Sequence, residues 1–196
     1  MPRFIHLNGP PGIGKSTLAR FYVDDHPGVL NLDIDGVRGM IGGWQDRFEE
    51  TGEIARPIAL GMAHTHLSEG RDVVMPQYLG RLSEIDRFEA VAVDTGAAFV
   101  EVVLMDTKER SIQRFTDRGD DDTLAWHRQV RDIVNRAGGA ALLADMYDQL
   151  AEVIRTRTNA VVVPSVAGAV RQTYEAVAAV LDDESGARAG GAADWN

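Results

Sequence analysis

The chain has 196 residues, enough for one domain with a well-buried core, and its 44% hydrophobic and 26% charged residues are ordinary for a globular protein. A formal net charge of −10 disfavours a nucleic-acid binder that works by bulk attraction, although a local arginine patch is compatible with it. The absence of cysteine excludes disulfides and thiolate metal sites. The N-terminal sequence MPRFIHLNG lacks a signal-peptide core and no apolar run approaches a membrane span, so we expect a cytoplasmic protein without a membrane segment.

Apolar runs alternate with helical patterns along the chain. The predicted strands are Arg3–Asn8, Val29–Asp33, Asp72–Pro76, Phe99–Asp106 and Ala160–Pro164. Most are near-continuous Val, Ile and Leu runs, typical of strands covered on both faces. The predicted helices are Lys15–Asp25, Ile54–Glu69, Ser83–Asp94, Thr107–Asp117, Thr123–Arg136, Ala140–Arg155 and Ala167–Leu181. The alternation predicts an α/β fold with a five-stranded parallel sheet and helices on both faces, with ligands at the carboxyl ends of the strands.

The first strand leads into GPPGIGKS, Gly9–Ser16, which fits G-x-x-x-x-G-K-[ST], and an amphipathic helix follows. Glycines let backbone N–H groups turn toward phosphate oxygens, and the helix N-terminus adds partial positive charge. We expect Lys15 to reach the β- and γ-phosphates of ATP and Ser16 to ligate Mg²⁺. A strand–helix turn that merely resembles the motif is the alternative, which the flanking elements disfavour. The predicted nucleotide-binding residues are Gly9, Pro11, Gly12, Ile13, Gly14, Lys15, Ser16 and Thr17.

Two carboxylates and an arginine follow the second strand in NLDIDGVRG, Asn31–Gly39. We place this strand beside the first, so that the three side chains face the terminal phosphate of the nucleotide. Transfer of a phosphoryl group to an alcohol needs a base near the hydroxyl and cations around the moving group. We assign Asp35 as the base, Asp33 to the water shell of Mg²⁺ and Arg38 to an anionic part of the acceptor; which aspartate is the base stays open. The alternative is helix-capping carboxylates with an exposed arginine.

Two polar segments are predicted to contact the acceptor. Trp44 lies in the region after the second strand, where ordinary packing is the alternative role. The loop after the third strand, at the carboxyl end of the sheet, contributes Gln77, Tyr78 and Arg81 on the basis of position alone.

The fourth strand ends at Asp106, which is either a metal-site residue of a hydrolytic NTPase or the start of a capping box with Glu109. We favour the capping box. The following ERSIQRFTDRG predicts a lid over roughly residues 110–123, in which Arg114 and Arg118 share a helix face; a solvated charged face is the alternative. Residues 120–122 are three aspartates, interpreted as a hinge and cap or, alternatively, as a site for a cationic acceptor.

We predict one domain over residues 1–181 and a mobile tail over residues 182–196, since DDESGARAGGAADWN is rich in Gly and Ala. No internal repeat or linker divides the chain.

The segments GPPGIGKSTLAR, HPGVLNLDIDGVR and ERSIQRFTDRG together resemble the 5′-kinase domain of phage-type polynucleotide kinases. More widely they are similar to small P-loop kinases such as chloramphenicol phosphotransferase, gluconate and shikimate kinases and zeta toxins. The resemblance implies a P-loop NTPase fold of the nucleoside-monophosphate-kinase type, with Asp35 as base and Arg38 on a substrate phosphate. It also implies that Arg114 and Arg118 close over the ATP phosphates.

The loop after the third strand departs from the polynucleotide kinases, because PQYLGR stands where they carry an acidic residue and an asparagine. With the net charge of −10, this predicts a small-molecule acceptor. We therefore expect a kinase that uses ATP and Mg²⁺ to phosphorylate a hydroxyl of a small molecule. A polynucleotide or nucleotide 5′-hydroxyl kinase, an NTPase that drives a conformational change, and a nucleotide-binding protein without phosphoryl transfer remain alternatives. The sequence leaves the oligomeric state open.

Overall fold

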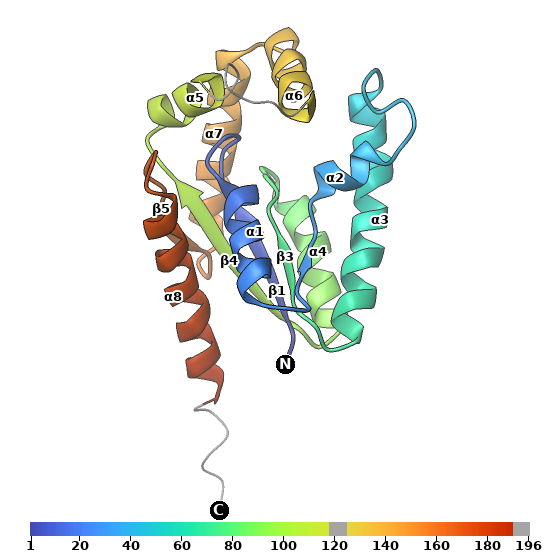
Figure 1. Cartoon of the computed structure of the whole chain (residues 1–196), viewed down its shortest axis with the longest axis vertical. Coiled ribbons are helices and arrows are strands. Elements are labelled where there is room, and N and C mark those ends of the chain that lie inside the picture. The colour runs from blue at the N-terminus through green and yellow to red at the C-terminus, as the bar shows by residue number, and fades with distance from the viewer. Residues whose placement is uncertain (118–124, 190–196) are drawn as a thin grey trace, which may run out of the picture.

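The computed structural model describes residues 1–117 and 125–189, which are arranged around one five-stranded sheet (Figure 1). The strands are β1 (Arg3–Asn8), β2 (Leu30–Asn31), β3 (Val73–Met75), β4 (Ala98–Met105) and β5 (Val161–Pro164). All four neighbouring pairs are parallel, in the order β2-β3-β1-β4-β5. The predicted parallel sheet is therefore confirmed.

The predicted place of β2 beside β1 is wrong, because β3 lies between them. Val73, Val74 and Met75 are fully buried, which suits a strand with a neighbour on each side and helices on both faces. β2 pairs through Leu30 and Asn31 alone, at the edge of the sheet. The carboxylates that follow β2 thus begin one strand further from the end of β1 than predicted.

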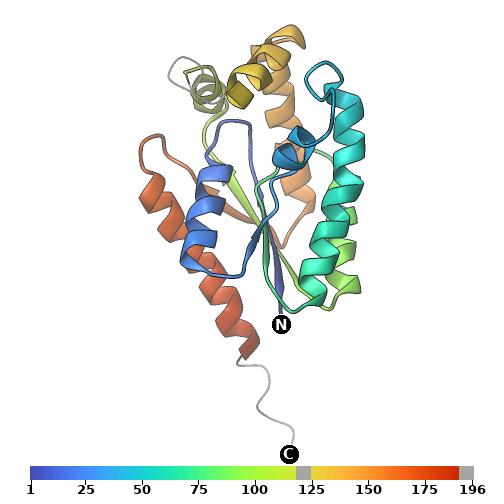
Figure 2. The same ribbon diagram turned by 45° about the vertical axis from the view of Figure 1, so that its right-hand side comes forward.

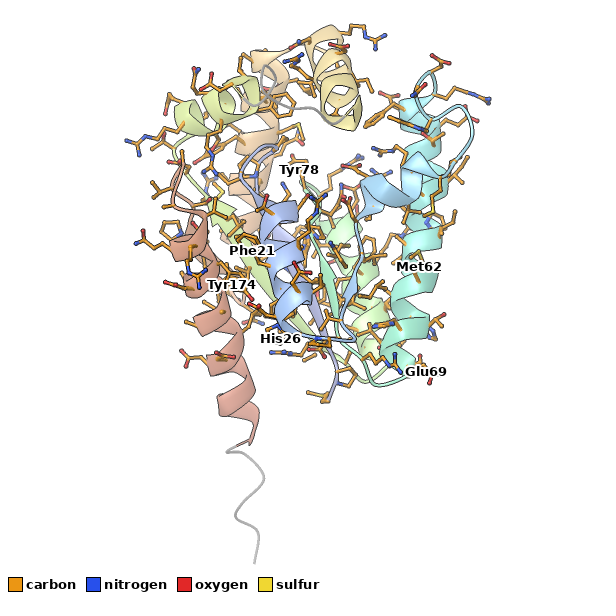
Figure 3. All side chains as sticks on the ribbon, viewed as in Figure 1. Phe21, His26, Met62, Glu69, Tyr78 and Tyr174 are labelled. Atoms are coloured by element: carbon orange, nitrogen blue, oxygen red, sulfur yellow. The ribbon has the colours of Figure 1, made fainter. Side chains whose placement is uncertain are left out.

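Helices cover both faces of the sheet (Figure 2). The alternation of side chains along β1 shows which helices cover which face. The covering helices are α1 (Lys15–Asp25), α3 (Phe48–Ser68), α4 (Leu82–Asp94), α7 (Ala140–Thr156) and α8 (Val170–Ala189). Phe4 packs into one hydrophobic cluster with α3, α4 and α7, whereas Ile5 and Leu7 pack into another with α1 and α8. Figure 3 shows Phe21 and Tyr174 where α1 meets α8, with 5.7 Å between their ring centroids.

Two boundaries on the β2 side differ from the prediction. A short helix, α2 (Ile34–Gly39), occupies a segment outside the predicted helices, and α3 begins at Phe48 rather than at Ile54. The first turns of α3, FEETGE, have no apolar periodicity, so sequence patterning could not detect them. Their acidic residues nevertheless suit the positive end of a helix.

At the carboxyl end of the sheet, α5 (Lys108–Asp117) contains the described part of the segment predicted as a lid, and α6 (Ala125–Arg136) follows that segment (Figure 1). Arg118 and the aspartates at 120–122 lie outside the described residues. α8 ends at Ala189, eight residues beyond the predicted end at Leu181, so the segment predicted as tail begins as helix. No helix in the described ranges is both long and apolar enough to cross a membrane.

Candidate functional site

The glycine-rich loop, Gly9–Ser16, joins β1 to α1, and its conformation depends on glycine. Gly9, Gly12 and Gly14 have φ angles of 146°, 80° and 111°, which residues with side chains rarely adopt. A β-carbon on Gly9 would also lie 2.6 Å from the carbonyl oxygen of Leu104 in β4. The three glycines therefore allow the tight turn that the motif predicts.

Lys15 opens α1, and its ammonium group lies inside the glycine-rich loop. Nζ donates hydrogen bonds to the carbonyl oxygens of Gly9 (2.7 Å) and Pro10 (3.0 Å). Ser16 follows directly and lines the same cavity as Lys15. A cation, a hydroxyl group and a helix N-terminus thus meet at one place, an arrangement suited to a polyphosphate.

The loop opens onto a cavity of about 1310 Å³, which we call the main cavity. Its described lining comes from the loop, helices α1 to α7, the segment 45–47 and the loop after β3. It exceeds the roughly 300–1,000 Å³ of a pocket for one small ligand, so it has room for a second substrate beside the phosphates. The predicted acceptor residue Trp44 is outside this described lining, although its neighbour Gln45 is in it.

Asp33 is the N-cap of α2. Its Oδ1 accepts hydrogen bonds from the backbone N–H groups of Asp35 (3.0 Å) and Gly36 (3.3 Å). These bonds satisfy two donors that have no partner within the helix. The capping role weighed for Asp33 is therefore present, and its carboxylate also lines the main cavity.

Asp35 and Arg38 form an ion pair on α2. Arg38 Nη1 donates to Asp35 Oδ1 over 2.9 Å, and both residues line the main cavity with Lys15. Burial raises the pKa of the Asp35 carboxyl, while the charges of Arg38 and Lys15 lower it. A carboxylate with a raised pKa is a better proton acceptor, so Asp35 has the environment of a general base.

Arg38 is almost fully buried, contrary to the alternative of an exposed arginine. Its side chain is 9% exposed, and the guanidinium lies 3.9 Å from the centre of the Phe48 ring. A β-carbon on Gly52 would lie 2.7 Å from its Nη2, so a side chain at position 52 would force the guanidinium to shift. α3 therefore packs against Arg38, and the contact with the Phe48 ring and the ion pair with Asp35 set the orientation of its guanidinium.

Three residues of the loop after β3, Gln77, Tyr78 and Arg81, were predicted to contact the acceptor, and all three line the main cavity. Gln77 and Tyr78 line the cavity, and Tyr78 Oη donates to the carbonyl oxygen of Met146 in α7 over 2.9 Å. Burial raises the pKa of Tyr78 to about 12. Arg81 lies at the rim with a 74% exposed side chain.

Arg114 holds the lid helix α5 to the glycine-rich loop. Its Nη2 donates to the carbonyl oxygen of Ile13 (2.8 Å) and its Nη1 to that of Ser165 (2.8 Å). Arg114 lines a second cavity of about 540 Å³, with Thr17 and the turn before α8, rather than the main cavity. The described conformation thus places Arg114 on the β5 side of the loop.

The predicted capping box at Asp106 is wrong. Thr107 is the residue before α5, and its Oγ1 accepts from the N–H of Arg110 (3.3 Å). Asp106 instead accepts from the N–H of Thr107 and lies 3.6 Å from Nη1 of Arg114. Its carboxylate therefore orients the arginine that joins lid and loop.

Sequence reasoning missed Asn8, the last residue of β1. Its fully buried amide bonds Gly9 of the glycine-rich loop and Leu79 of the loop after β3. It also missed Phe115, whose backbone lies so close that a β-carbon on Gly12 would be 3.0 Å from its Cα. The signal for Asn8 was a polar residue that ends an apolar strand directly before the motif.

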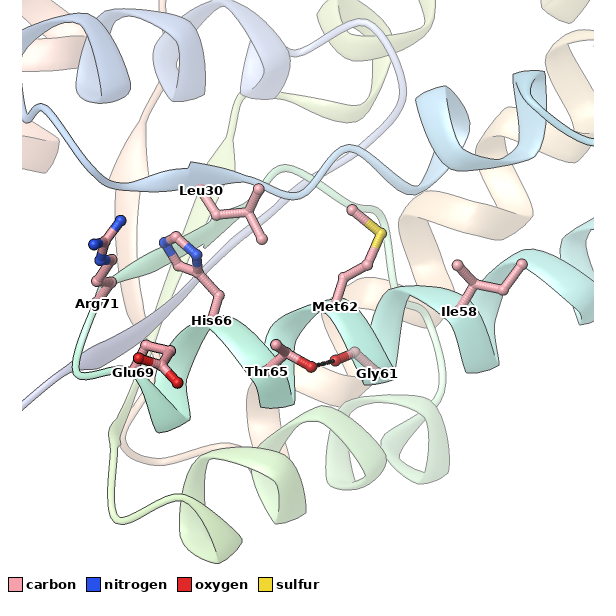
Figure 4. Close-up of a pocket in the computed structure, with 8 residues that line it drawn as sticks. All are labelled: Leu30, Ile58, Gly61, Met62, Thr65, His66, Glu69 and Arg71. Carbon is pink, nitrogen blue, oxygen red and sulfur yellow. Dashed lines mark hydrogen bonds between the residues drawn. The ribbon is translucent and has the colours of Figure 1, made fainter.

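A separate depression of about 680 Å³ lies between α3 and the edge strand β2 (Figure 4). Leu30, Ile58 and Met62 give it an apolar floor, and Thr65 donates to the carbonyl oxygen of Gly61 (2.9 Å). It shares no lining residue with the two cavities at the glycine-rich loop. None of the predicted site residues that the structure describes lines this depression.

Comparisons with known proteins agree with this geometry. The model of the AAA_33 family, described as an AAA domain, matches residues 4–137. No curated protein sequence matches the chain.

Among solved structures, a gluconokinase from Sinorhizobium meliloti 1021 matches with 18% identity and a TM-score of 0.60, over 94% of this chain and 96% of the other. The tunicamycin resistance protein of Deinococcus radiodurans matches with 16% identity and a TM-score of 0.62, over 92% and 96%. The RNA repair complex Pnkp1/Rnl/Hen1 matches with 15% identity and a TM-score of 0.58, over 79% of this chain and 46% of the other. These matches confirm the predicted P-loop kinase-like fold.

Proposed function

Because the chain belongs to the AAA_33 family of AAA domains, we propose that it transfers the γ-phosphoryl group of ATP to a hydroxyl group of a small molecule. The observation that carries this proposal is the meeting of Lys15, Ser16 and the Asp35–Arg38 pair in the main cavity. Lys15 and Ser16 suit the phosphates of ATP, and Asp35 offers a base beside the cationic side chain of Arg38.

The proposed reaction is a direct displacement. The acceptor oxygen forms a bond to the γ-phosphorus, the bond from that phosphorus to the β,γ-bridging oxygen breaks, and ADP leaves. Asp35 accepts the proton of the acceptor hydroxyl. Lys15 stabilises the charge on the phosphates, and Arg38 keeps Asp35 oriented through the 2.9 Å ion pair.

The residues beside the glycine-rich loop fit Mg²⁺ that arrives with ATP. Asp33 uses Oδ1 to cap α2, which leaves Oδ2 for a water ligand of the metal, and Ser16 offers its hydroxyl in the same cavity. When bound there, Mg²⁺ would neutralise charge on the phosphate oxygens. We assign Arg114 to the contact between the lid helix α5 and the glycine-rich loop. Through this contact Arg114 would hold α5 closed over the nucleotide.

The test is a screen of metabolites, antibiotics and oligonucleotides for ATP-dependent gain of mass and release of ADP. Asp35→Asn is expected to keep ATP affinity and to lower turnover about a hundredfold or more. Asp24→Asn, an exposed aspartate of α1, is the matched control. Unchanged turnover in Asp35→Asn would end the assignment of the base. Phosphorylation of oligonucleotide 5′ ends alone would replace the small-molecule acceptor, and absence of transfer to every acceptor would leave a nucleotide-binding protein.

A further inference from the structure

One wall of the main cavity is largely apolar. It consists of the lining residues that come from α5, α6, α7 and the turn between α6 and α7, and we call it the lid-side wall. Its large apolar side chains are Phe115, Val130, Ile133, Val134, Leu142 and Met146. The other polar or charged members in the described lining are Arg131, Arg136 and Gln149, so this wall has no carboxylate there.

The apolar side chains of the lid-side wall follow helical spacing. Val130, Ile133 and Val134 are three and four residues apart and share one face of α6. Leu142 and Met146 are four residues apart and share one face of α7. Such apolar faces normally pack against a hydrophobic core.

Here the six large apolar side chains of the wall are left out of the core. Neither hydrophobic cluster of the described residues includes any of them. All six are half-buried and line the main cavity. An apolar group that enters the cavity would therefore gain free energy by removing this surface from water.

The wall contributed by α2, α3 and α4 is charged instead. Residues 33–56 and 81–84 of the described lining include four arginines and six carboxylates. Phe48 is their one large apolar residue, and its ring lies against the guanidinium of Arg38. Closure of the lid-side wall directly onto this surface would take charged groups out of water and place them against apolar side chains, which is unfavourable. A ligand with one polar and one apolar part would suit both walls.

Two contacts place the lid-side wall beside both parts of the proposed reaction centre. A β-carbon on Gly12 of the glycine-rich loop would lie 3.0 Å from the Cα of Phe115. Tyr78, in the loop that lines the acceptor side, donates to the carbonyl oxygen of Met146 over 2.9 Å. The apolar wall therefore extends from the nucleotide loop to the acceptor loop.

We propose that the acceptor is amphiphilic: its hydroxyl group is attached to an aromatic or branched aliphatic group that packs against the lid-side wall. The inference rests on the proposed function and specifies the substrate class of the same site. The hydroxyl would lie toward Asp35 and the charged wall. The apolar group would cover side chains such as Val134 and Leu142, which a small polyol would leave in water.

Binding of a homologous series tests the wall apart from catalysis. The protein is saturated with Mg²⁺ and a non-hydrolysable ATP analogue, and 1,2-butanediol, 1,2-hexanediol and 1,2-octanediol are titrated by NMR. The three probes share one polar end and differ only in chain length. We expect affinity to rise about tenfold for each pair of added methylene groups. Affinity that does not depend on chain length would overturn the proposal.

Matched variants locate the apolar contact. Val134→Ser should weaken 1,2-octanediol binding at least fivefold and 1,2-butanediol binding less than twofold, whereas Val134→Leu should keep both. Val93→Ser, at a 71% exposed position of α4, and Ile58→Ser, in the depression between α3 and β2, should change neither. Loss in both Val134 variants with a lowered Tm, equal loss in Val134→Ser and Val93→Ser, or loss in Ile58→Ser alone would each overturn the assignment to the lid-side wall.

Other covers of the wall give different results. If the lid closes on itself, saturation with the nucleotide analogue should abolish binding of all three diols. If a second copy of the chain covers the wall, sedimentation should show a dimer that Val134→Ser dissociates. Either result would overturn an amphiphilic acceptor.

Paired acceptors distinguish this failure from failure of the proposed function. Methyl and phenyl β-D-glucopyranoside share a polyol and differ in the apolar group, and acceptors that emerge from the screen are paired in the same way. We expect kcat/KM to be at least tenfold higher for the apolar member, and Val134→Ser to remove most of this difference. Transfer that is independent of the apolar group and of Val134 would overturn the amphiphilic acceptor and keep the kinase. Binding of the diols that depends on chain length and on Val134, without transfer to any acceptor, would do the reverse.

Discussion

The side-chain amide of Asn8 pairs with both backbone polar groups of Leu79. Asn8 Nδ2 donates to the Leu79 carbonyl oxygen over 3.0 Å, and Asn8 Oδ1 accepts from the Leu79 N–H over 3.1 Å. The same Oδ1 accepts from the N–H of Gly9 over 2.8 Å. One fully buried amide therefore joins the glycine-rich loop, which is assigned to the nucleotide, to the loop that lines the acceptor side.

Asn8→Asp tests this connection. The change keeps the size of the side chain but removes the donor to Leu79 and buries a charge, so we expect a loss of stability of about 1–3 kcal/mol. We also expect the KM for ATP and the KM for the acceptor to rise together, in steady-state kinetics. Asn159→Asp, in an exposed turn, is the control. Change in only one of the two KM values would show that the amide does not couple the loops.

The pH dependence of kcat tests the base. Because burial raises the pKa of Asp35 above its ordinary 3.8, the carboxyl becomes protonated at a higher pH than a free aspartate. A protonated Asp35 cannot accept the hydroxyl proton, so kcat should fall as pH drops through a value above 3.8. A pH–rate profile of Asp35→Asn should lack this acid limb. Retention of the limb in that variant would assign it to another group.

Asp33 has a capping role and a proposed metal role, which two substitutions separate. Asp33→Ala removes the acceptor of two N–H groups and should lower stability by about 0.5–2 kcal/mol in denaturant unfolding. Asp33→Asn can still cap, so its stability should be near that of the unmodified chain. Its half-saturating Mg²⁺ concentration should rise about tenfold, since the charge is gone. Equal Mg²⁺ dependence would leave Asp33 a cap alone.

Arg114→Gln tests the lid contact. The change removes hydrogen bonds from α5 to Ile13 and Ser165, so we expect α5 to separate from the glycine-rich loop and ATP affinity to fall about tenfold. Arg110→Gln on the same helix, where the side chain is 70% exposed, serves as the control. Equilibrium binding of a fluorescent ATP analogue measures both. Equal affinities would show that the contact does not support the nucleotide site.

The sheet and the glycine-rich loop could be predicted because their signals are local. An apolar run such as β1, the spacing of glycines and Lys15, and the helix that follows are all visible within a short window. The position of β2 could not be read in this way, since the insertion of β3 between β1 and β2 depends on which strands bury both faces.

The setting of Arg38 shows the same limit within the site. Its separation from Asp35 by three residues is a property of the sequence, and in a helix this spacing places the two side chains on one face. Its burial under Phe48 and against Gly52 comes from α3, whose first turns lack apolar periodicity. Arg56 and Glu84 form an ion pair in the lining of the main cavity. This pair depends on how α3 packs beside α4, a tertiary relationship that no local pattern contains.

The bond between Asn8 and Leu79 uses only main-chain groups on the Leu79 side. The neighbouring side chains of that loop can therefore be exchanged without removing its anchor. A designer who wishes to change the lining of the main cavity could vary Gln77 while this anchor stays in place, whereas a change at Tyr78 would also remove its hydrogen bond to Met146 of α7.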